Sequence, residues 1–295
     1  MLSSLASAVD RYTAEHPNDS GLYPTQVDGL SLFRSATTEV PVHALYPASV
    51  CVVVQGAKTC TVGDDIHEYD EGDGLFVCVD VPALGRVTRA SPQAPYLAVV
   101  IDLDFLLLAE LALHDPGPST PTPSAEPGTF VGRIPERALN AIERLVDLLE
   151  TPSSISFLAP GILREVTYWL LQGPNGDALR QLGQPTNPSR RIADAVASMK
   201  QAFPGPVRVE ALAEAVHMSL SSFYTHFRTA TGMTPIQYYK RLRLLEARRM
   251  LTTGEAARAR DTAFRVGYES PSQFSRDYTR TFGSPPSHDI VRAVA

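Results

Sequence analysis

The chain has 295 residues, enough for roughly two domains with separate cores, and a formal net charge of −6. No apolar run approaches the ~20 residues of a membrane span, and the N-terminus does not resemble a signal peptide. Because three cysteines cannot all pair in disulfides, the composition argues against membrane and disulfide-built secreted proteins and predicts a reducing, cytoplasmic setting.

The first part of the chain is predicted to be β-structure. Three β-branched stretches, 51–63, 74–82 and 95–104, are separated by Gly, Asp and Pro. Short strands spaced this closely favour a sandwich or small barrel. The pattern does not say which strand face points inward: Cys51, Val53 and Gln55 share one face, and Val50, Val52 and Val54 share the other.

A proline-rich stretch and two amphipathic helices follow. Residues 115–128 hold five prolines in fourteen residues, which predicts a loop or linker. Pro135 opens a helix whose apolar residues recur at three and four, and a second helix covers 157–173. These helices either complete the first domain's core or pack against their copies in another chain, and dimerisation is slightly favoured.

The C-terminal third is basic although the whole chain is acidic. Residues 188–295 carry 16 Lys and Arg against 9 Asp and Glu, a balance of +7. Residues 1–187 carry 10 against 23, a balance of −13. Such asymmetry is expected of an anion-binding module joined to another domain.

This basic region contains an internal repeat. Residues 218–235 and 268–286 superpose at an offset of 51, which aligns Ser219 with Ser270, Phe223 with Phe274, Phe227 with Tyr278, Gly232 with Gly283, and Pro235 with Pro286. The two aromatic residues of each copy lie at i and i+4, on one helix face, and are predicted to be core. Short apolar helices precede both copies, at 209–216 and 261–267, and Gly267 is predicted to form the second turn.

The repeat therefore predicts two helix-turn-helix units, joined by the basic helix 238–251. The second helix of each unit presents short polar and basic side chains between its core aromatics. Such a face suits the DNA major groove, where Arg pairs with guanine and Ser or Thr reaches base edges or phosphates. The alternative is a plain helical bundle with polar surface helices.

These motifs resemble the AraC/XylS family of transcription regulators. The stretch VGYESPSQFSRDYTRTFGSPP is similar to that family's second-motif signature, and TGMTPIQYYKRLRLLEARRML to its linker helix. Residues 45–104 and 158–182 resemble the N-terminal domain of one branch of the family. The resemblance implies an α+β chain: a cupin-like β-barrel sensor at 1–130 with flanking helices, a helical segment at 131–187 for dimerisation, and an all-α DNA-binding domain at 188–295.

The resemblance also implies which residues read DNA. Carried onto this sequence, the first recognition helix exposes Ser221, Tyr224, Thr225 and Arg228, and the second exposes Ser272, Ser275, Arg276 and Arg280. We expect Arg276 to contact a base. Arg228, Arg280 and Lys240 are expected to contact phosphates.

The front domain is predicted to be a binding pocket and not an active site. Its metal-ligand candidates, His43, His67, Glu68 and His114, are scattered and include no His-x-His pair, so neither a metal nor a cofactor is expected. The cysteines allow thiolate sensing, but Lys58 near Cys60 is the one basic neighbour, and buried inert cysteine is favoured.

The sequence thus predicts a ligand-responsive regulator, most often an activator in this family, that lays two recognition helices into successive major-groove faces. Its expected partners are double-stranded promoter DNA, a small-molecule effector, RNA polymerase and a second copy of the chain, with no membrane. Two alternatives stay open: a cupin-type enzyme with a helical appendage, and a constitutive DNA binder whose barrel only dimerises.

Overall fold

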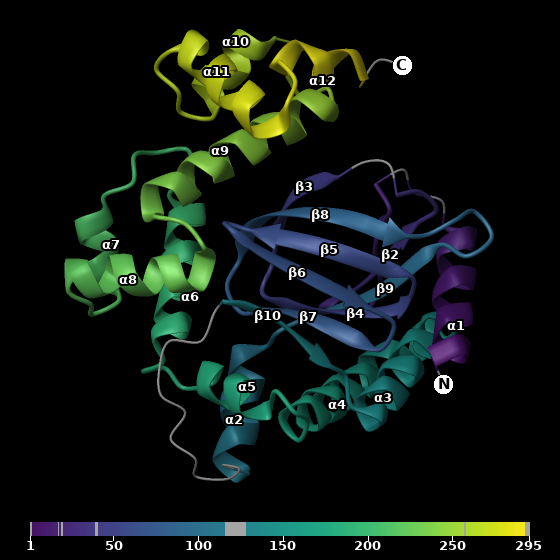
Figure 1. The fold of residues 1–295 in the computed structure, drawn as a ribbon. Coiled ribbons are helices and arrows are strands. Elements are labelled where there is room, and N and C mark those ends of the chain that lie inside the picture. The colour runs from purple at the N-terminus through teal and green to yellow at the C-terminus, as the bar shows by residue number, and fades with distance from the viewer. Residues whose placement is uncertain are drawn as a thin grey trace.

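The computed structural model describes residues 2–16, 18, 20–38, 41–115, 128–256 and 258–292. Most of the proline-rich linker lies outside them. The N-terminal part forms two antiparallel sheets, in the orders β1-β2-β9-β4-β7-β10 and β3-β8-β5-β6 (Figure 1). The strands are β1 (Leu22–Pro24), β2 (Leu30–Ser35), β3 (Val42–Tyr46), β4 (Ser49–Gln55), β5 (Ala57–Val62), β6 (Asp65–Asp70), β7 (Asp73–Val77), β8 (Val81–Arg89), β9 (Tyr96–Asp102) and β10 (Thr129–Arg133).

The predicted β domain is confirmed, but its strands form two facing sheets and not one closed barrel. The single β stretch expected at 51–63 breaks at Gly56, whose φ is +84°. A Cβ there would lie 2.4 Å from the Arg89 carbonyl oxygen, so only glycine fits this crossing between the sheets. Beyond it the chain continues as β5 in the second sheet.

The two faces of β4 have different neighbours. Cys51 and Val53 point between the two sheets, into a cluster that includes Leu75, Val77 and Val81. The opposite face, with Val50, Val52 and Val54, packs under the helices. The interior of the sandwich therefore lies on the Cys51 side, which the alternation in the sequence left open.

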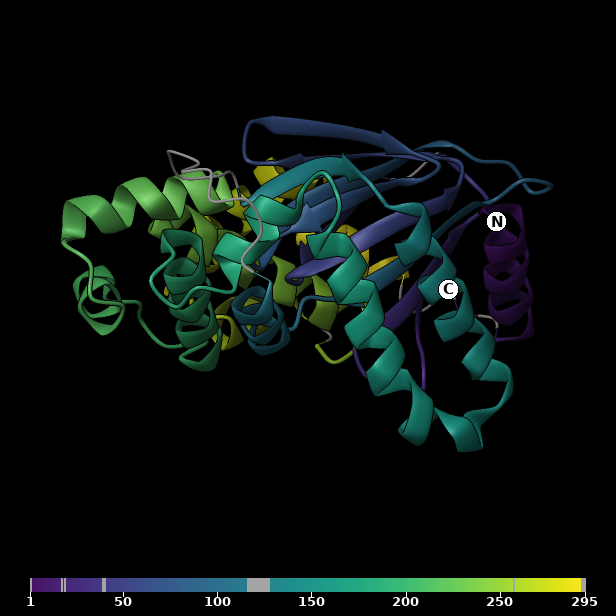
Figure 2. The same cartoon turned by 90° about the horizontal axis from the view of Figure 1, so that it is seen from below.

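Helices cover the outer face of the larger sheet. They are α1 (Leu2–Glu15), α2 (Phe105–His114), α3 (Glu136–Asp147), the short 3₁₀ turn η1 (Leu148–Glu150), α4 (Pro152–Leu171) and α5 (Gly176–Leu182). Figure 2 shows α3 and α4 side by side as a hairpin, with α1 near them. The stripe Leu139, Ile142, Leu145 and Val146 on α3 is buried in this core. Thus α3 completes the first domain, whereas α4 leaves Phe157 84 % exposed.

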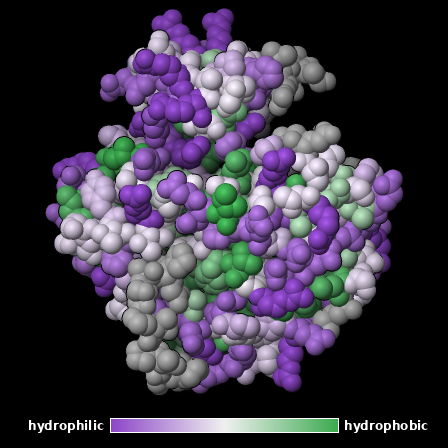
Figure 3. Space-filling model, in the orientation of Figure 1, coloured by the Kyte–Doolittle hydropathy of each residue, from purple (hydrophilic) through white to green (hydrophobic). Residues whose placement is uncertain are grey.

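The C-terminal part is helical, as predicted. It consists of α6 (Pro188–Gln201), α7 (Val209–Ala215), α8 (Leu220–Thr231), α9 (Pro235–Thr252), α10 (Ala259–Arg265), α11 (Pro271–Phe282) and α12 (Pro286–Arg292). In Figure 1, α6–α8 lie beside the sheets, α10–α12 form an upper lobe, and α9 joins them. The surface of that lobe is mostly hydrophilic, and a waist separates it from the rest (Figure 3).

The two helix-turn-helix units have the same construction. Each recognition helix begins at a serine whose hydroxyl accepts a backbone N–H three residues on, from Ser222 in α8 and from Gln273 in α11. Each ends at a left-handed glycine, Gly232 or Gly283. The aromatic pairs predicted to be core, Phe223 with Phe227 and Phe274 with Tyr278, are fully buried.

The turns differ by one residue, which the sequence alignment missed. In both units an N–H bonds back to a buried alanine carbonyl, from Met218 to Ala213 and from Tyr268 to Ala263, both at 2.9 Å. These pairs superpose at an offset of 50, whereas the recognition helices superpose at 51. The left-handed residue of the first turn is therefore His217, φ +54°, in the place of Gly267.

Candidate nucleic-acid interface

The first recognition helix, α8, presents a continuous polar face. Ser221, Tyr224, Thr225 and Arg228 are all exposed, because the core aromatics Phe223 and Phe227 hold the opposite face inward. The Thr225 hydroxyl donates to the Ser221 carbonyl at 3.1 Å. Arg228 has no ion-pair partner among the described residues. This face matches the one predicted.

The second recognition helix, α11, has the same arrangement. Ser272, Arg276 and Arg280 are exposed, and Ser275 is half-buried. Within the described residues the Arg276 guanidinium has no hydrogen-bond or ion-pair partner, so it is available to an external acceptor. A free guanidinium on an exposed recognition helix is the group that reads guanine edges bidentately.

Two of the predicted phosphate contacts are already engaged within the protein. The Lys240 Nζ lies 2.7 Å from an Asp277 carboxylate oxygen, and Arg280 also pairs with Asp277. The Asp277 side chain is 4 % exposed. Since a buried carboxylate needs its cationic partners, these two residues join α9 to α11 and are less free than Arg228 and Arg276.

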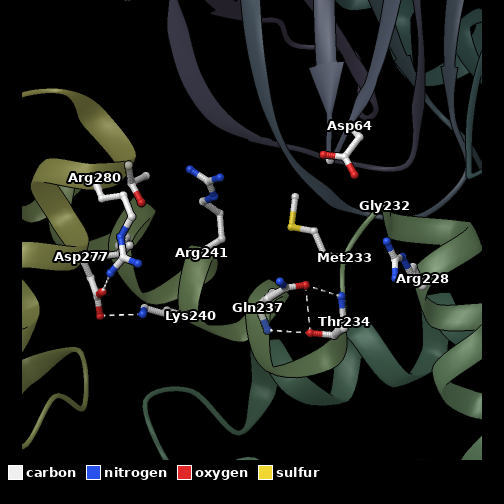
Figure 4. A pocket seen from close by; sticks show the side chains of 13 residues that line it. Asp64, Arg228, Gly232, Met233, Thr234, Gln237, Lys240, Arg241, Asp277 and Arg280 are labelled. Carbon is white, nitrogen blue, oxygen red and sulfur yellow. Dashed lines mark hydrogen bonds and ion pairs between the residues drawn. The ribbon is translucent and has the colours of Figure 1, made fainter.

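A basic cleft of about 400 Å³ lies between the two units (Figure 4). Four cations line it: Arg228, Lys240, Arg241 and Arg280. Sequence reasoning missed Arg241, because nothing in the sequence distinguishes it from the other basic residues of α9. Burial lowers the pKa of the Arg241 guanidinium. A cleft with this excess of cations attracts the phosphate backbone.

The sensor domain supplies the other wall of this cleft. Asp64, in the turn between β5 and β6, lies across from Arg228 (Figure 4). The preceding residue, Gly63, approaches the α8–α9 turn so closely that a Cβ would lie 2.5 Å from the Gly232 carbonyl oxygen. An acidic turn of the sensor therefore faces the predicted DNA contact Arg228.

A second contact joins the β7–β8 corner to the first helix-turn-helix unit. Val79 belongs to that unit's core cluster although it lies in the sensor's sequence. The neighbouring Asp80 pairs with Lys200 on α6, and the Tyr238 hydroxyl of α9 donates to the Asp80 carbonyl at 2.8 Å. No local pattern in the sequence indicated this docking.

The metal-ligand candidates of the front domain lie apart. His43 is on β3, His114 is at the end of α2, and His67 on β6 forms a hydrogen bond with the Thr129 hydroxyl at 2.9 Å. In the described part of the chain no three His, Cys, Asp or Glu residues are grouped to hold a metal. Nor does any described helix have the length and apolarity to cross a bilayer.

Comparison with known proteins decides the family. A family model described as "AraC-type transcriptional regulator N-terminus" matches residues 26–178, more than half of the chain. A second, described as "Helix-turn-helix domain", matches residues 212–289. The chain belongs to the AraC-type transcriptional regulators. As such it binds DNA through the helix-turn-helix units described above.

Individual relatives agree. The chain is 27 % identical over 238 residues to the HTH-type transcriptional activator RhaS of Salmonella schwarzengrund (strain CVM19633), which covers 79 % of this chain and 76 % of RhaS. The crystal structure of ToxT from Vibrio cholerae O395 superposes with a TM-score of 0.51 at 11 % identity, over 90 % of this chain and 98 % of ToxT. A structure of unsaturated fatty acid bound ToxT from V. cholerae strain SCE256 gives a TM-score of 0.52 at 10 % identity, over 89 % and 94 %. The ToxT likeness shows the shared fold.

Proposed function

We propose that this AraC-type regulator is a ligand-responsive activator that reads promoter DNA with the exposed faces of α8 and α11. The observation that carries the proposal is that each of two recognition helices of the same construction exposes an arginine without a partner among the described residues, Arg228 on α8 and Arg276 on α11. Arg276 reads a base, Arg228 contacts a phosphate at the cleft, and the serine and threonine hydroxyls of both faces supplement them.

Response to a ligand is supported by the front domain and by the relatives. A separate sensor with its own interior precedes the DNA-binding helices. RhaS is named a transcriptional activator, and ToxT has been crystallised with an unsaturated fatty acid. We propose the same general organisation here: a small-molecule effector binds the sensor and promotes activation, with RNA polymerase as the further partner in the cytoplasm.

The β7–β8 corner gives the effector a route to the DNA-binding domain. Val77 and Val81 point into the sandwich interior, whereas Val79 between them packs in the core of the first helix-turn-helix unit. A shift of the two sheets that moves Val77 and Val81 also moves Val79. A ligand that prefers one sheet arrangement would thus shift the population of docked and undocked DNA-binding domains.

We propose a homodimer formed through α4, with 131–187 as the helical segment and 188–295 as the DNA-binding domain. Because α3 is buried in the sensor core, the remaining apolar surface of the hairpin is the exposed side of α4, with Phe157 and Leu158. Exposed apolar side chains of this size on one helix favour a partner helix.

The two alternatives gain less support. A cupin-type enzyme needs a catalytic constellation, and the histidines that could contribute one lie on separate elements. A constitutive DNA binder needs no contact between sensor and DNA-binding domain, whereas Asp80, Val79 and Gly63 all make one. We therefore propose a regulator that is not an enzyme and that is controlled by its sensor.

A protection footprint tests this function. The full chain is applied to DNA upstream of its own gene, beside Arg276→Ala and the control Arg260→Ala, which removes an exposed arginine from α10. We expect protection of two major-groove faces about one helical turn apart. Arg276→Ala should cost roughly 1–3 kcal/mol of specific binding and relax one base preference, and Arg260→Ala should cost little. Unchanged preferences in Arg276→Ala would contradict the assignment.

A further inference from the structure

A polar cluster lies inside the sandwich, among apolar side chains. Lys58 on β5 points between the sheets and is 6 % exposed. Its ammonium lies 4.5 Å from the ring centre of Phe33, 5.3 Å from Tyr46 and 5.8 Å from Tyr96. The Tyr46 hydroxyl hydrogen-bonds to it, and none of the described carboxylates pairs with it. Aromatic faces compensate a buried cation only in part, so the interior lacks an anion.

Two hydroxyls in the same interior are poorly hydrogen-bonded. The hydroxyls of Tyr69, 3 % exposed, and of Tyr96, fully buried, make only weak contacts, with the Cys51 thiol and with each other, and neither has a hydrogen bond of good geometry. Both lie beside the Cys51 thiol. Burial raises the pKa of both tyrosines well above the ordinary value, so both remain protonated donors. A buried hydroxyl with only weak contacts is unfavourable, and two of them in an interior that also holds an ammonium without a carboxylate indicate that a strong acceptor would be stabilised there.

The cysteines do not supply that acceptor. Cys51, Cys60 and Cys78 are buried, and none of them forms a disulfide. Burial raises the pKa of Cys60 to about 12 and raises that of Cys51, so these two thiols are neutral near pH 7. They neither neutralise Lys58 nor act as thiolate nucleophiles.

Gly85 makes room for the cluster. It lies on β8, opposite Cys60, and a Cβ there would lie 2.2 Å from the Tyr46 hydroxyl oxygen and 3.3 Å from the Lys58 Nζ. A side chain at this position would displace the ammonium. Glycine at position 85 thus leaves room for the Lys58 ammonium on the inward face of β5. The other inward residues of this strand are Cys60 and Val62.

We propose that the sandwich interior at Lys58 is the effector site and that it binds a small organic monoanion, such as a carboxylate, whose acid group pairs with Lys58 and accepts from Tyr69 and Tyr96. This inference rests on the proposed ligand response and names its ligand class. A surface hollow of about 360 Å³ includes Lys58 and Tyr69 in its lining. Its rim carries Glu68, Asp70 and Asp73, and this acidic rim disfavours ligands with more than one negative charge.

Thermal unfolding of the full chain with small acids tests the site. Acetate, benzoate and hexanoate are each compared with their neutral amides at equal ionic strength. We expect at least one acid, at about tenfold its Kd, to raise the Tm by ~2–4 °C more than its amide. Lys58→Met should abolish that difference. The control Arg86→Met, which removes an exposed cation from the same sheet, should keep it.

Two further variants keep the test decisive if Lys58→Met does not fold. Tyr69→Phe and Tyr96→Phe each remove a buried hydroxyl that makes only weak contacts, so the empty protein should keep about the same stability while the acid-specific shift shrinks. No acid-specific shift in the wild-type chain, or a shift that survives Lys58→Met, would overturn the site.

DNA affinity measured in parallel separates this site from the proposed function. An acid that stabilises the chain through Lys58 and changes DNA affinity supports both. An acid that binds through Lys58 but leaves DNA affinity unchanged supports the site and contradicts ligand control. DNA binding without any acid-specific shift contradicts the site alone.

Discussion

Asp80 of the sensor and Lys200 of the DNA-binding domain form an ion pair, with 2.5 Å between the carboxylate oxygen and the ammonium nitrogen. The Asp80 carboxylate also accepts the Ala48 N–H at 2.9 Å, which fixes the β7–β8 corner to β4. The pair therefore links α6 to a rigid part of the sandwich. Because the pair lies between the two domains, breaking it should shift the equilibrium between docked and undocked DNA-binding domains.

Removing Lys200 is expected to loosen the docked arrangement. Because Lys200 and Asp80 are partly exposed, the pair contributes about 1 kcal/mol at most. Docking places the acidic Asp64 turn at the cleft, so Lys200→Met should raise the DNA affinity of the ligand-free protein by roughly two- to fivefold. Fluorescence anisotropy with operator DNA measures this. Asp80→Asn is a poorer test, since it also disturbs the Ala48 contact. Lower affinity in a folded Lys200→Met would contradict a restraining role.

The Asp64 turn offers a matched pair of substitutions. Asp64 lines the basic cleft and faces Arg228, whereas the adjacent Asp65 does not line it. Asp64→Asn removes one repulsion toward DNA phosphates and should raise affinity about two- to threefold at low salt, with the gain shrinking as salt screens it. Asp65→Asn has the same net charge and should have a smaller effect. Equal gains in DNA affinity from both variants would show that only the net charge matters and that the position of Asp64 at the cleft does not.

Substitutions of Lys240 and Arg276 are expected to affect protein stability differently. Lys240→Met removes one of the two cations that pair with the buried Asp277 and leaves Arg280, and since Lys240 is itself partly exposed it should lower the unfolding free energy by about 1–2 kcal/mol. Arg276→Met removes a cation without an internal partner and should change stability by less than about 0.5 kcal/mol. Urea unfolding distinguishes them. If Lys240→Met is as stable as the wild type but binds DNA more weakly, then Lys240 acts as a phosphate contact, as predicted from the sequence, and not as a structural ion-pair partner.

The dimer proposal has a direct test on α4. Phe157 is the most exposed large apolar side chain of the hairpin, so Phe157→Glu should leave the fold intact and convert a dimer to a monomer. Sedimentation or light scattering gives the mass. Ile66→Glu, on the exposed strand β6, provides the control for adding a charge at an exposed apolar position. If the wild-type chain is a monomer, the proposed dimer interface on α4 does not exist.

Local regularity explains what the sequence could predict. The serine and glycine caps of α8 and α11, the aromatic pairs at i and i+4, and the apolar stripe of α3 each follow from spacing within one helix. The exposed faces of the recognition helices follow from the same spacing. The aromatic pairs and the α3 stripe were therefore predicted from the residues themselves, whereas the serines and glycines were aligned without being identified as caps and the DNA-contact residues were named from the resemblance.

Long-range pairing explains what it could not. The strand β10 pairs with β7 across the proline-rich linker, and no pattern within Thr129–Arg133 distinguishes it from loop. The Lys240–Asp277 and Lys200–Asp80 pairs were equally hidden, because each joins two different elements of the chain. The exposure of the recognition-helix residues could thus be predicted, whereas the contacts of Lys240, Arg280 and Asp80 with other parts of the protein could not.

His43 makes the contact between the sensor and the second helix-turn-helix unit sensitive to pH. Its ring lies edge-on to Phe282 of α11, with 5.1 Å between centroids. Burial, together with Arg248 and Arg241, lowers the pKa of His43 to about 4. Between the ordinary value of 6.5 and about 4, the unfolded chain binds a proton at this residue that the folded chain does not, so stability falls as pH falls through this window.

His43 is partly exposed, so this loss is about 1–2 kcal/mol after allowance for solvent screening. Urea unfolding at pH 7.5 and pH 5 measures it, with His43→Phe keeping an aromatic edge against Phe282 but no titrating nitrogen. The variant should lose less stability than the wild type between the two pH values, by about 1 kcal/mol. His288→Gln, which removes an exposed histidine from α12, should behave as the wild type. Equal losses in wild type and His43→Phe would show that carboxylates alone set the acid sensitivity and that His43 does not contribute to it.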